Sequence, residues 1–159
     1  MSAEFYQSLP KKRMGAGCLL FDESGRVMLL QPTYKPTYEI PGGVIESDES
    51  PRACCEREVQ EELSIKIAVK RLLIVDYNSY PDELHKTESL MFIFDGGTLT
   101  AAQIKNIQFD DGEIASFHFF APDALPDDIN PALNRRIVAA LQQTTRDGAI
   151  YLENQKSPT

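Results

Sequence analysis

The chain lacks the features that mark membrane, secreted and nucleic-acid-binding proteins. No apolar run approaches the roughly 18 residues of a membrane span, and segment 1–13 has no apolar signal-peptide core. The cysteines are odd in number and two are adjacent, so no disulfide framework is expected (Cys18, Cys54, Cys55). The net charge is −8 and the longest basic run is 11–13, which argues against nucleic-acid duplex partners. We therefore expect a cytoplasmic protein without membrane or duplex partners.

What the chain does contain fits one small domain. Its 159 residues are enough for a sizeable core, and an apolar content of 42% is ordinary for a globular protein. We expect a single domain over 1–159 with its core at about 14–145. Segments 1–12 and 153–159 are predicted to be a flexible arm and a frayed tail.

Apolar runs separated by turn-forming residues predict a sheet. The runs 18–21 and 27–30 flank turn-forming residues 22–26, which predicts a β-hairpin. Apolar and polar residues alternate from Ile65 to Val69, which predicts a half-buried strand that continues to residue 75. Further strands are predicted at 90–94 and 113–120.

Two main helices accompany these strands, so the predicted fold class is α/β. One helix of about three turns is expected after Ser50, with serine as N-cap and Pro51 as first residue. A second is expected after Asn130. The remaining predictions are a loop at 78–87, a short turn of helix at 121–125 and packing of 150–152 against the domain, while 100–112 has no assigned element.

Three carboxylates share one face of the first predicted helix: Glu58, Glu61 and Glu62. At about 100° per residue, they project within about a 100° arc. Adjacent carboxylates repel by about 4 kcal/mol per pair at ~4 Å and an effective dielectric of ~20, so a cleft-facing cluster needs a cation. Oxygen ligands favour Mg²⁺ or Mn²⁺. The alternative interpretation is an ordinary solvated acidic face.

The wider spacing resembles the signature of the Nudix hydrolase family, G-x5-E-x7-R-E-U-x-E-E-x-G-U, where U is a bulky aliphatic residue. The matching residues are Gly43, Glu49, Arg57, Glu58, Val59, Glu61, Glu62 and Ile65. Ser64 departs from the pattern, because the family has glycine there. If that position needs left-handed backbone angles, serine costs about 1–2 kcal/mol.

The resemblance implies a Nudix-like α/β/α sandwich, with a mixed central sheet and the motif as loop, helix and loop. It implies that Glu49 and Arg57 pair as a clamp; the alternative is a surface salt bridge worth about 0–1 kcal/mol. One glutamate would act as general base, and the motif does not identify which. The implied metal ligands are Gly42 through its carbonyl, Glu58, Glu61, Glu62 and, with Asp110 and Asp111 as rivals, Glu113.

Candidate substrate contacts lie outside the carboxylate cluster. The double glycine Gly42–Gly43 would let a phosphate approach the backbone closely. Tyr34, Tyr38 or Phe119 could stack on a nucleobase, although core packing is the ordinary role of an aromatic side chain. Phe119 stands where the family often has tryptophan, which this chain lacks.

The leading functional hypothesis is a hydrolase that uses Mg²⁺ or Mn²⁺ to cleave the diphosphate linkage of a nucleoside diphosphate joined to another moiety X. Water would attack phosphorus. One alternative is a pyrophosphohydrolase that removes oxidised nucleoside triphosphates of the 8-oxo-dGTP type. Another is a nucleotide-binding sensor without activity. The expected partner is a small nucleotide or diphosphate, and the assembly state is left open, with a homodimer among the options.

Overall fold

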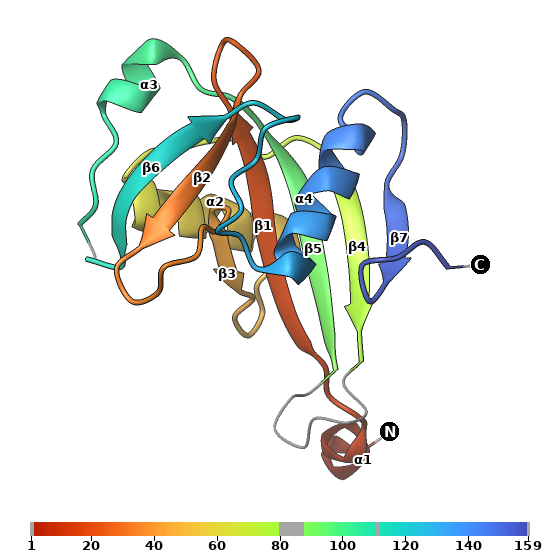
Figure 1. Ribbon diagram of the computed structural model, residues 1–159. Coiled ribbons are helices and arrows are strands. Elements are labelled where there is room, and N and C mark those ends of the chain that lie inside the picture. Colours follow the sequence, from red (N-terminus) through yellow and green to blue (C-terminus); the bar gives the residue numbers. More distant parts are fainter. Residues whose placement is uncertain (1, 80–87, 111, 159) are drawn as a thin grey trace.

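The computed structural model describes residues 2–79, 88–110 and 112–158. Within them, seven strands form one mixed sheet in the order β6-β2-β1-β5-β4-β7, and β3 pairs with β1 beside this path (Figure 1). The strands are β1 Arg13–Phe21, β2 Val27–Pro32, β3 Gly42–Val44, β4 Leu72–Asn78, β5 Ser89–Thr98, β6 Ile114–Phe120 and β7 Ile150–Glu153. The helices are α1 Ala3–Ser8, α2 Pro51–Leu63, α3 Ala101–Lys105 and α4 Pro131–Gln143.

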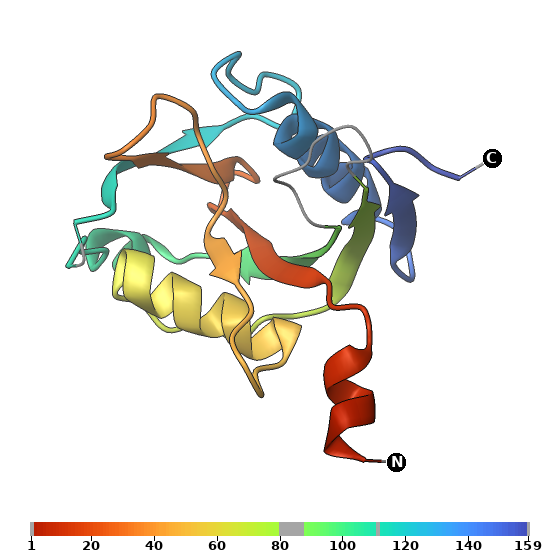
Figure 2. The same cartoon turned by 90° about the horizontal axis from the view of Figure 1, so that it is seen from below.

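Helices α2 and α4 cover opposite faces of the sheet, as Figure 2 shows. Successive residues of β1 therefore enter two different cores, because side chains alternate along a strand. Cys18 and Leu20 pack in the core under α2, while Leu19 packs in the core under α4. This arrangement confirms the predicted α/β/α sandwich with a mixed sheet.

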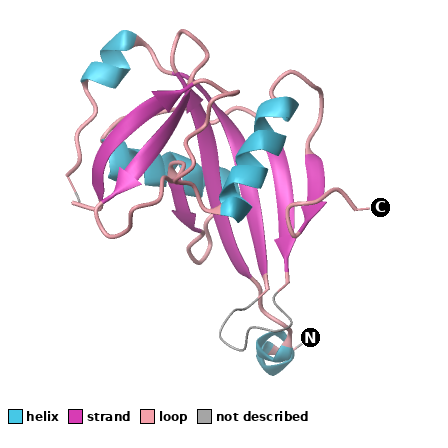
Figure 3. Ribbon diagram, in the orientation of Figure 1, coloured by secondary structure: helices cyan, strands magenta, loops and turns pink. Residues whose placement is uncertain are grey.

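The sheet combines parallel and antiparallel pairs. Strand β1 runs antiparallel to β2 and β3 but parallel to β5, and β4 runs parallel to β7. The β1–β2 hairpin has Phe21 opposite Val27, which confirms the predicted turn at 22–26. Figure 3 shows β3 followed by a loop and α2, and 64–71 then lead to β4 without a helix or strand, which completes the predicted loop–helix–loop.

The strand predicted from residue 65 is wrong over 65–71, since β4 begins only at Leu72. The alternation is real, because Ile65 and Val69 are buried in the core under α2. The backbone of Val69 bonds to side chains of the helix rather than to a neighbouring strand. The Val69 N–H donates to Glu56 Oε1 at 3.1 Å, and the Val69 carbonyl accepts from Arg52. Alternating burial therefore describes an extended segment, but not its hydrogen-bond partners.

Local signals explain two further differences. The predicted turn of helix at 121–125 is a single hydrogen-bonded turn, with Ala124 N–H donating to the Ala121 carbonyl at 2.9 Å. In the unassigned stretch, α3 starts at a capping box in which Thr100 and Gln103 bond each other's backbone. That T-x-x-Q spacing was a readable signal. Of the loop predicted at 78–87, Asn78 belongs to β4, while 80–87 lie outside the described residues.

The chain ends contain more structure than an arm and a tail. The N-terminal segment forms α1 with Ser2 as its N-cap. After β7, Asn154 N–H donates to the Tyr77 carbonyl at 2.8 Å, and Gln155 N–H donates to Asp76 Oδ1 at 3.0 Å. Backbone hydrogen bonds therefore continue past β7 as far as Lys156, while flexibility of the arm and the tail stays a prediction. No helix among the described residues is long and apolar enough to cross a membrane.

Candidate functional site

Capping residues set the start of helix α2, and its buried apolar stripe sets its orientation. The Ser50 hydroxyl accepts from the Ala53 N–H at 3.2 Å, and Pro51 occupies the first helical position, as predicted. Cys54, Cys55, Val59 and Leu63 are buried against the sheet. Burial of this stripe leaves the glutamate-bearing side of the helix toward β3 and solvent.

Arg57 connects four parts of the motif. Its Nε and Nη2 donate to the two oxygens of Glu49 at 2.8 and 3.0 Å, so the expected clamp is a bidentate pair. Its Nη1 donates to Glu58 at 2.9 Å and to Glu61 at 2.8 Å, and its Nη2 also reaches the Val44 carbonyl at 3.2 Å. One guanidinium therefore compensates three carboxylates and bonds the backbone of β3.

This charge arrangement shifts two pKa values in opposite directions. Hydrogen bonding from Arg57 lowers the pKa of Glu49 to about 2. Burial raises the pKa of Glu58, and the nearby Arg57 charge opposes that rise. Glu58 is therefore a partly desolvated carboxylate, and a metal cation beside it would favour its ionised form.

The double glycine forms the other wall of the carboxylate site. Gly42 has a φ of +148°, and a Cβ there would lie 2.3 Å from the Ala16 carbonyl oxygen. Its N–H donates to Glu62 Oε2 at 3.0 Å. A Cβ at Gly43 would lie 2.2 Å from Glu58 Oε1. Only glycines therefore let β3 approach both β1 and the carboxylates of α2 this closely.

The three carboxylates of α2 do not converge on one point. Glu62 reaches Gly42, Glu58 lies against Gly43, and Glu61 points to Arg57 with its side chain 53% exposed. Accordingly, no group of three or more acidic, histidine or cysteine side chains is arranged as a metal site within the part of the chain described. The donor chemistry still fits Mg²⁺ or Mn²⁺, because carboxylate and backbone oxygens crowd the Gly42–Gly43 strip.

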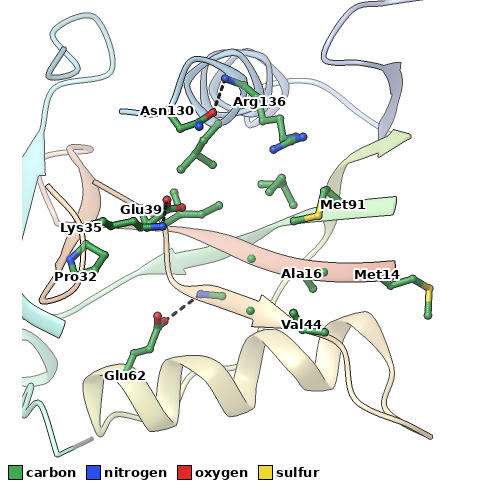
Figure 4. A pocket seen from close by; sticks show the side chains of 18 of the residues that line it. Met14, Ala16, Pro32, Lys35, Glu39, Val44, Glu62, Met91, Asn130 and Arg136 are labelled. Atoms are coloured by element: carbon green, nitrogen blue, oxygen red, sulfur yellow. Dashed lines mark hydrogen bonds and ion pairs between the residues drawn. The ribbon is translucent and has the colours of Figure 1, made fainter. Parts of the chain in front are cut away.

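A cavity of about 650 Å³ adjoins this strip, over β1 and β5 and between β3 and the start of α4 (Figure 4). Gly42, Gly43 and Glu62 line one end of it. Glu58 and Glu61 are not among its lining residues. The cavity therefore meets the carboxylate site at Glu62, where a ligand could reach both.

Of the aromatic candidates, the structure brings only Tyr34 to the cavity. Tyr34 is 68% exposed at its rim, where the Lys35 ammonium lies 5.3 Å from the ring centroid. Tyr38 instead packs edge-on against Phe120, with ring centroids 5.3 Å apart, in the core under α4. Phe119 packs against the core under α2. The proposed substrate contact at Tyr38 therefore has no support from its position.

Of the distal acidic candidates, the structure brings only Asp110 to the end of α2 within the part of the chain described. Glu113 is exposed, precedes β6, does not line the cavity, and its carbonyl accepts from the Thr33 N–H at 2.8 Å. Asp111 lies outside the described residues. Asp110 accepts a hydrogen bond from the Ser64 hydroxyl at 2.6 Å. Ser64 does adopt left-handed angles, φ 54° and ψ 25°, at the C-cap of α2.

Sequence reasoning missed Arg136, a buried charged residue of the cavity. Arg136 lines the cavity and shares the buried stripe of α4 with Leu133, Ile137 and Ala140. A charged residue on an apolar helical stripe was the signal that could have revealed it.

Comparison with known proteins agrees with this geometry. The family model of the NUDIX domain matches residues 11–141. The chain belongs to the Nudix family. A MutT-like protein from Streptomyces ambofaciens is 35% identical over 72 residues, which cover 45% of this chain and 47% of that protein. Diphosphoinositol polyphosphate phosphohydrolase 2 from Rattus norvegicus is 33% identical over 78 residues, covering 48% of this chain and 42% of that protein.

A solved Nudix-fold structure extends the likeness to most of the chain. The MutT protein from Methanosarcina mazei Go1 matches with a TM-score of 0.69 at 21% identity, covering 88% of this chain and 100% of that one. At that identity the match shows the fold. The alignments span less than half the length of both curated relatives.

Proposed function

We propose that this Nudix protein hydrolyses the diphosphate linkage of a small nucleoside diphosphate derivative, with a divalent metal ion held by α2. The observation that carries the proposal is the contact of Glu62 and Glu58 with Gly42–Gly43 at the end of the cavity. Membership of the family supports phosphoanhydride chemistry. The net charge of −8 favours a small anionic ligand neutralised by a cation rather than a polyanion bound by basic residues.

The residues would divide the work as follows. Glu58, Glu61, Glu62 and the Gly42 carbonyl would hold Mg²⁺ or Mn²⁺. When bound, the ion would neutralise the phosphates and lower the pKa of a water molecule. Arg57 would orient Glu58 and Glu61 and offset their mutual repulsion, as its hydrogen bonds to both support. A carboxylate of this group would accept the proton of the attacking water.

The reaction breaks one phosphorus–oxygen bond of the anhydride. The water oxygen bonds to one phosphorus, and the other phosphate leaves with the bridging oxygen. In ¹⁸O-labelled water, the label should therefore appear on a phosphate of one product. Label on a sugar carbon would contradict attack at phosphorus.

Metal dependence and one substitution test the proposal. Turnover should vanish with EDTA and return with Mg²⁺ or Mn²⁺. Glu62→Gln keeps the shape of the side chain but removes its charge, so kcat should fall roughly 10²–10⁴-fold. Glu23→Gln, in the exposed turn between β1 and β2, is the matched control and should retain activity. Full turnover in excess EDTA, or unchanged kcat in Glu62→Gln, would refute the metal assignment.

A substrate panel separates this function from its alternatives. Nucleoside diphosphate derivatives should yield a nucleoside monophosphate and a phosphorylated X, whereas an oxidised triphosphate would yield pyrophosphate. Diphosphoinositol polyphosphates belong in the panel because the rat relative is named for them. Tight nucleotide binding without product at any metal concentration would favour a sensor. Cytoplasmic location and a homodimer stay predictions.

A further inference from the structure

A buried arginine lies on the side of the cavity opposite the carboxylates. Arg136 is 9% exposed and reaches from α4 toward the strands, whereas Glu62 rises from α2 on the other side of β1 and β3 (Figure 4). Both residues line the cavity. A ligand whose phosphates lie beside Glu62 would therefore extend its other end toward Arg136.

A buried network holds the guanidinium in one orientation. Nε donates to Asp76 Oδ2 at 2.6 Å, and Nη2 donates to Asn78 Oδ1 at 2.8 Å. Asp76 and Asn78 are fully buried on β4, and Gln155 hydrogen-bonds both of them. Among the described residues, Nη1 has no hydrogen-bond partner. Because Nε and Nη2 hold the planar guanidinium in place, Nη1 is a pre-oriented hydrogen-bond donor on the cavity side of Arg136.

The surroundings limit what this donor can recognise. Ile40, Ile93 and Leu133 are buried apolar residues that line the same cavity. Asp76 balances the charge of Arg136, so an anionic ligand would meet a paired cation and an apolar wall. A flat, neutral ring that carries a hydrogen-bond acceptor suits this environment better than a second phosphate.

We propose that Arg136 is a specificity-determining residue that donates a hydrogen bond to a carbonyl oxygen of the substrate's nucleobase. The site would then favour keto bases over amino bases, because an exocyclic amino group would place N–H against N–H in a desolvated slot. The inference rests on the proposed function, since it requires the phosphates to lie at α2.

Matched substrate pairs test this contact. Inosine and adenosine diphosphate derivatives with the same X differ on the ring edge, where one has a carbonyl and the other an amino group. Uridine and cytidine derivatives make a second such pair. In the wild-type protein, kcat/KM should favour the keto member of at least one pair by roughly tenfold or more.

Two variants test the role of Arg136. The double variant Asp76→Asn/Arg136→Gln removes both buried charges together, which avoids stranding one of them. Its keto-to-amino ratio should fall toward one. Arg136→Lys keeps the charge but loses the planar guanidinium, so its keto-to-amino ratio should also fall. It serves as the test if the double variant does not fold. Arg146→Gln, an exposed cation after α4, should keep the wild-type ratio.

Equilibrium binding separates this inference from the proposed function. Dissociation constants for inosine and adenosine diphosphates, measured by calorimetry without turnover, should show the same preference and the same loss in the variants. Hydrolysis with a wild-type ratio near one, or a ratio unchanged in both Arg136 variants, would overturn the inference and leave the function standing. Absence of hydrolysis together with an Arg136-dependent binding preference would overturn the hydrolytic function and leave only the contact between Arg136 and the base standing.

Discussion

Ser64, the residue that departs from the Nudix signature, allows two opposing effects to be measured separately. Its left-handed backbone favours glycine, but its hydroxyl donates to Asp110 at 2.6 Å. The same helix end receives a second bond from the loop, since Gln108 N–H donates to the Leu63 carbonyl at 3.2 Å. Ser64 therefore has a strained backbone, but its hydroxyl links α2 to the segment that precedes β6.

The two effects are similar in size. Left-handed angles cost a non-glycine residue about 1–2 kcal/mol, and an exposed hydrogen bond contributes about 1 kcal/mol. Ser64→Ala keeps the strain and loses the bond, so unfolding free energy should fall by about 1 kcal/mol. Ser64→Gly loses the same bond but relieves the strain, so its stability should stay within about 1 kcal/mol of wild type.

Thermal unfolding followed by circular dichroism measures the difference. For a chain of this size, about 1 kcal/mol corresponds to about 2–4 °C in Tm, so Ser64→Ala should melt a few degrees below Ser64→Gly. A double-mutant cycle with Asp110→Ala should show that Ser64→Ala has no additional effect once its partner is gone. Equal Tm values for the alanine and glycine variants would refute the reasoning about backbone strain.

Two further perturbations test the Arg57 clamp and the glycine wall. The folded-state pKa of Glu49, about 2, lies below its ordinary value of 4.5, so its stabilisation is fully present above pH ~4.5 and is lost as pH falls through about 2. In Glu49→Gln, the free energy of unfolding measured in urea should therefore fall less steeply over that pH range than in the wild-type protein. An equally steep fall in both proteins would contradict the pairing. Gly43→Ala should displace the Glu58 carboxylate, lowering kcat roughly 10²-fold while the circular dichroism spectrum is retained. Near wild-type kcat in that variant would show that the close approach of Glu58 is dispensable.

Local chemistry explains why α2 could be predicted. A serine cap, a first-turn proline and an apolar row act within one helical turn, so their effect does not depend on the rest of the fold. The β1–β2 hairpin follows in the same way from its short turn. The segment 65–71 was harder, because the same alternating pattern serves either a strand or an extended chain bonded to a helix.

The sequence by itself determined the family, the α/β class, the hairpin, both main helices and the presence of Glu58, Glu61 and Glu62 on one helix, because these depend on spacing within a short segment. Tertiary structure alone decided how those carboxylates are distributed. It brought Glu62 to Gly42 and Tyr38 into the core, and it placed Arg136 from α4 beside a cavity that begins at Glu62. The physical reason is that sheet order and helix packing join segments that lie far apart in the sequence, and no local pattern encodes which of them meet.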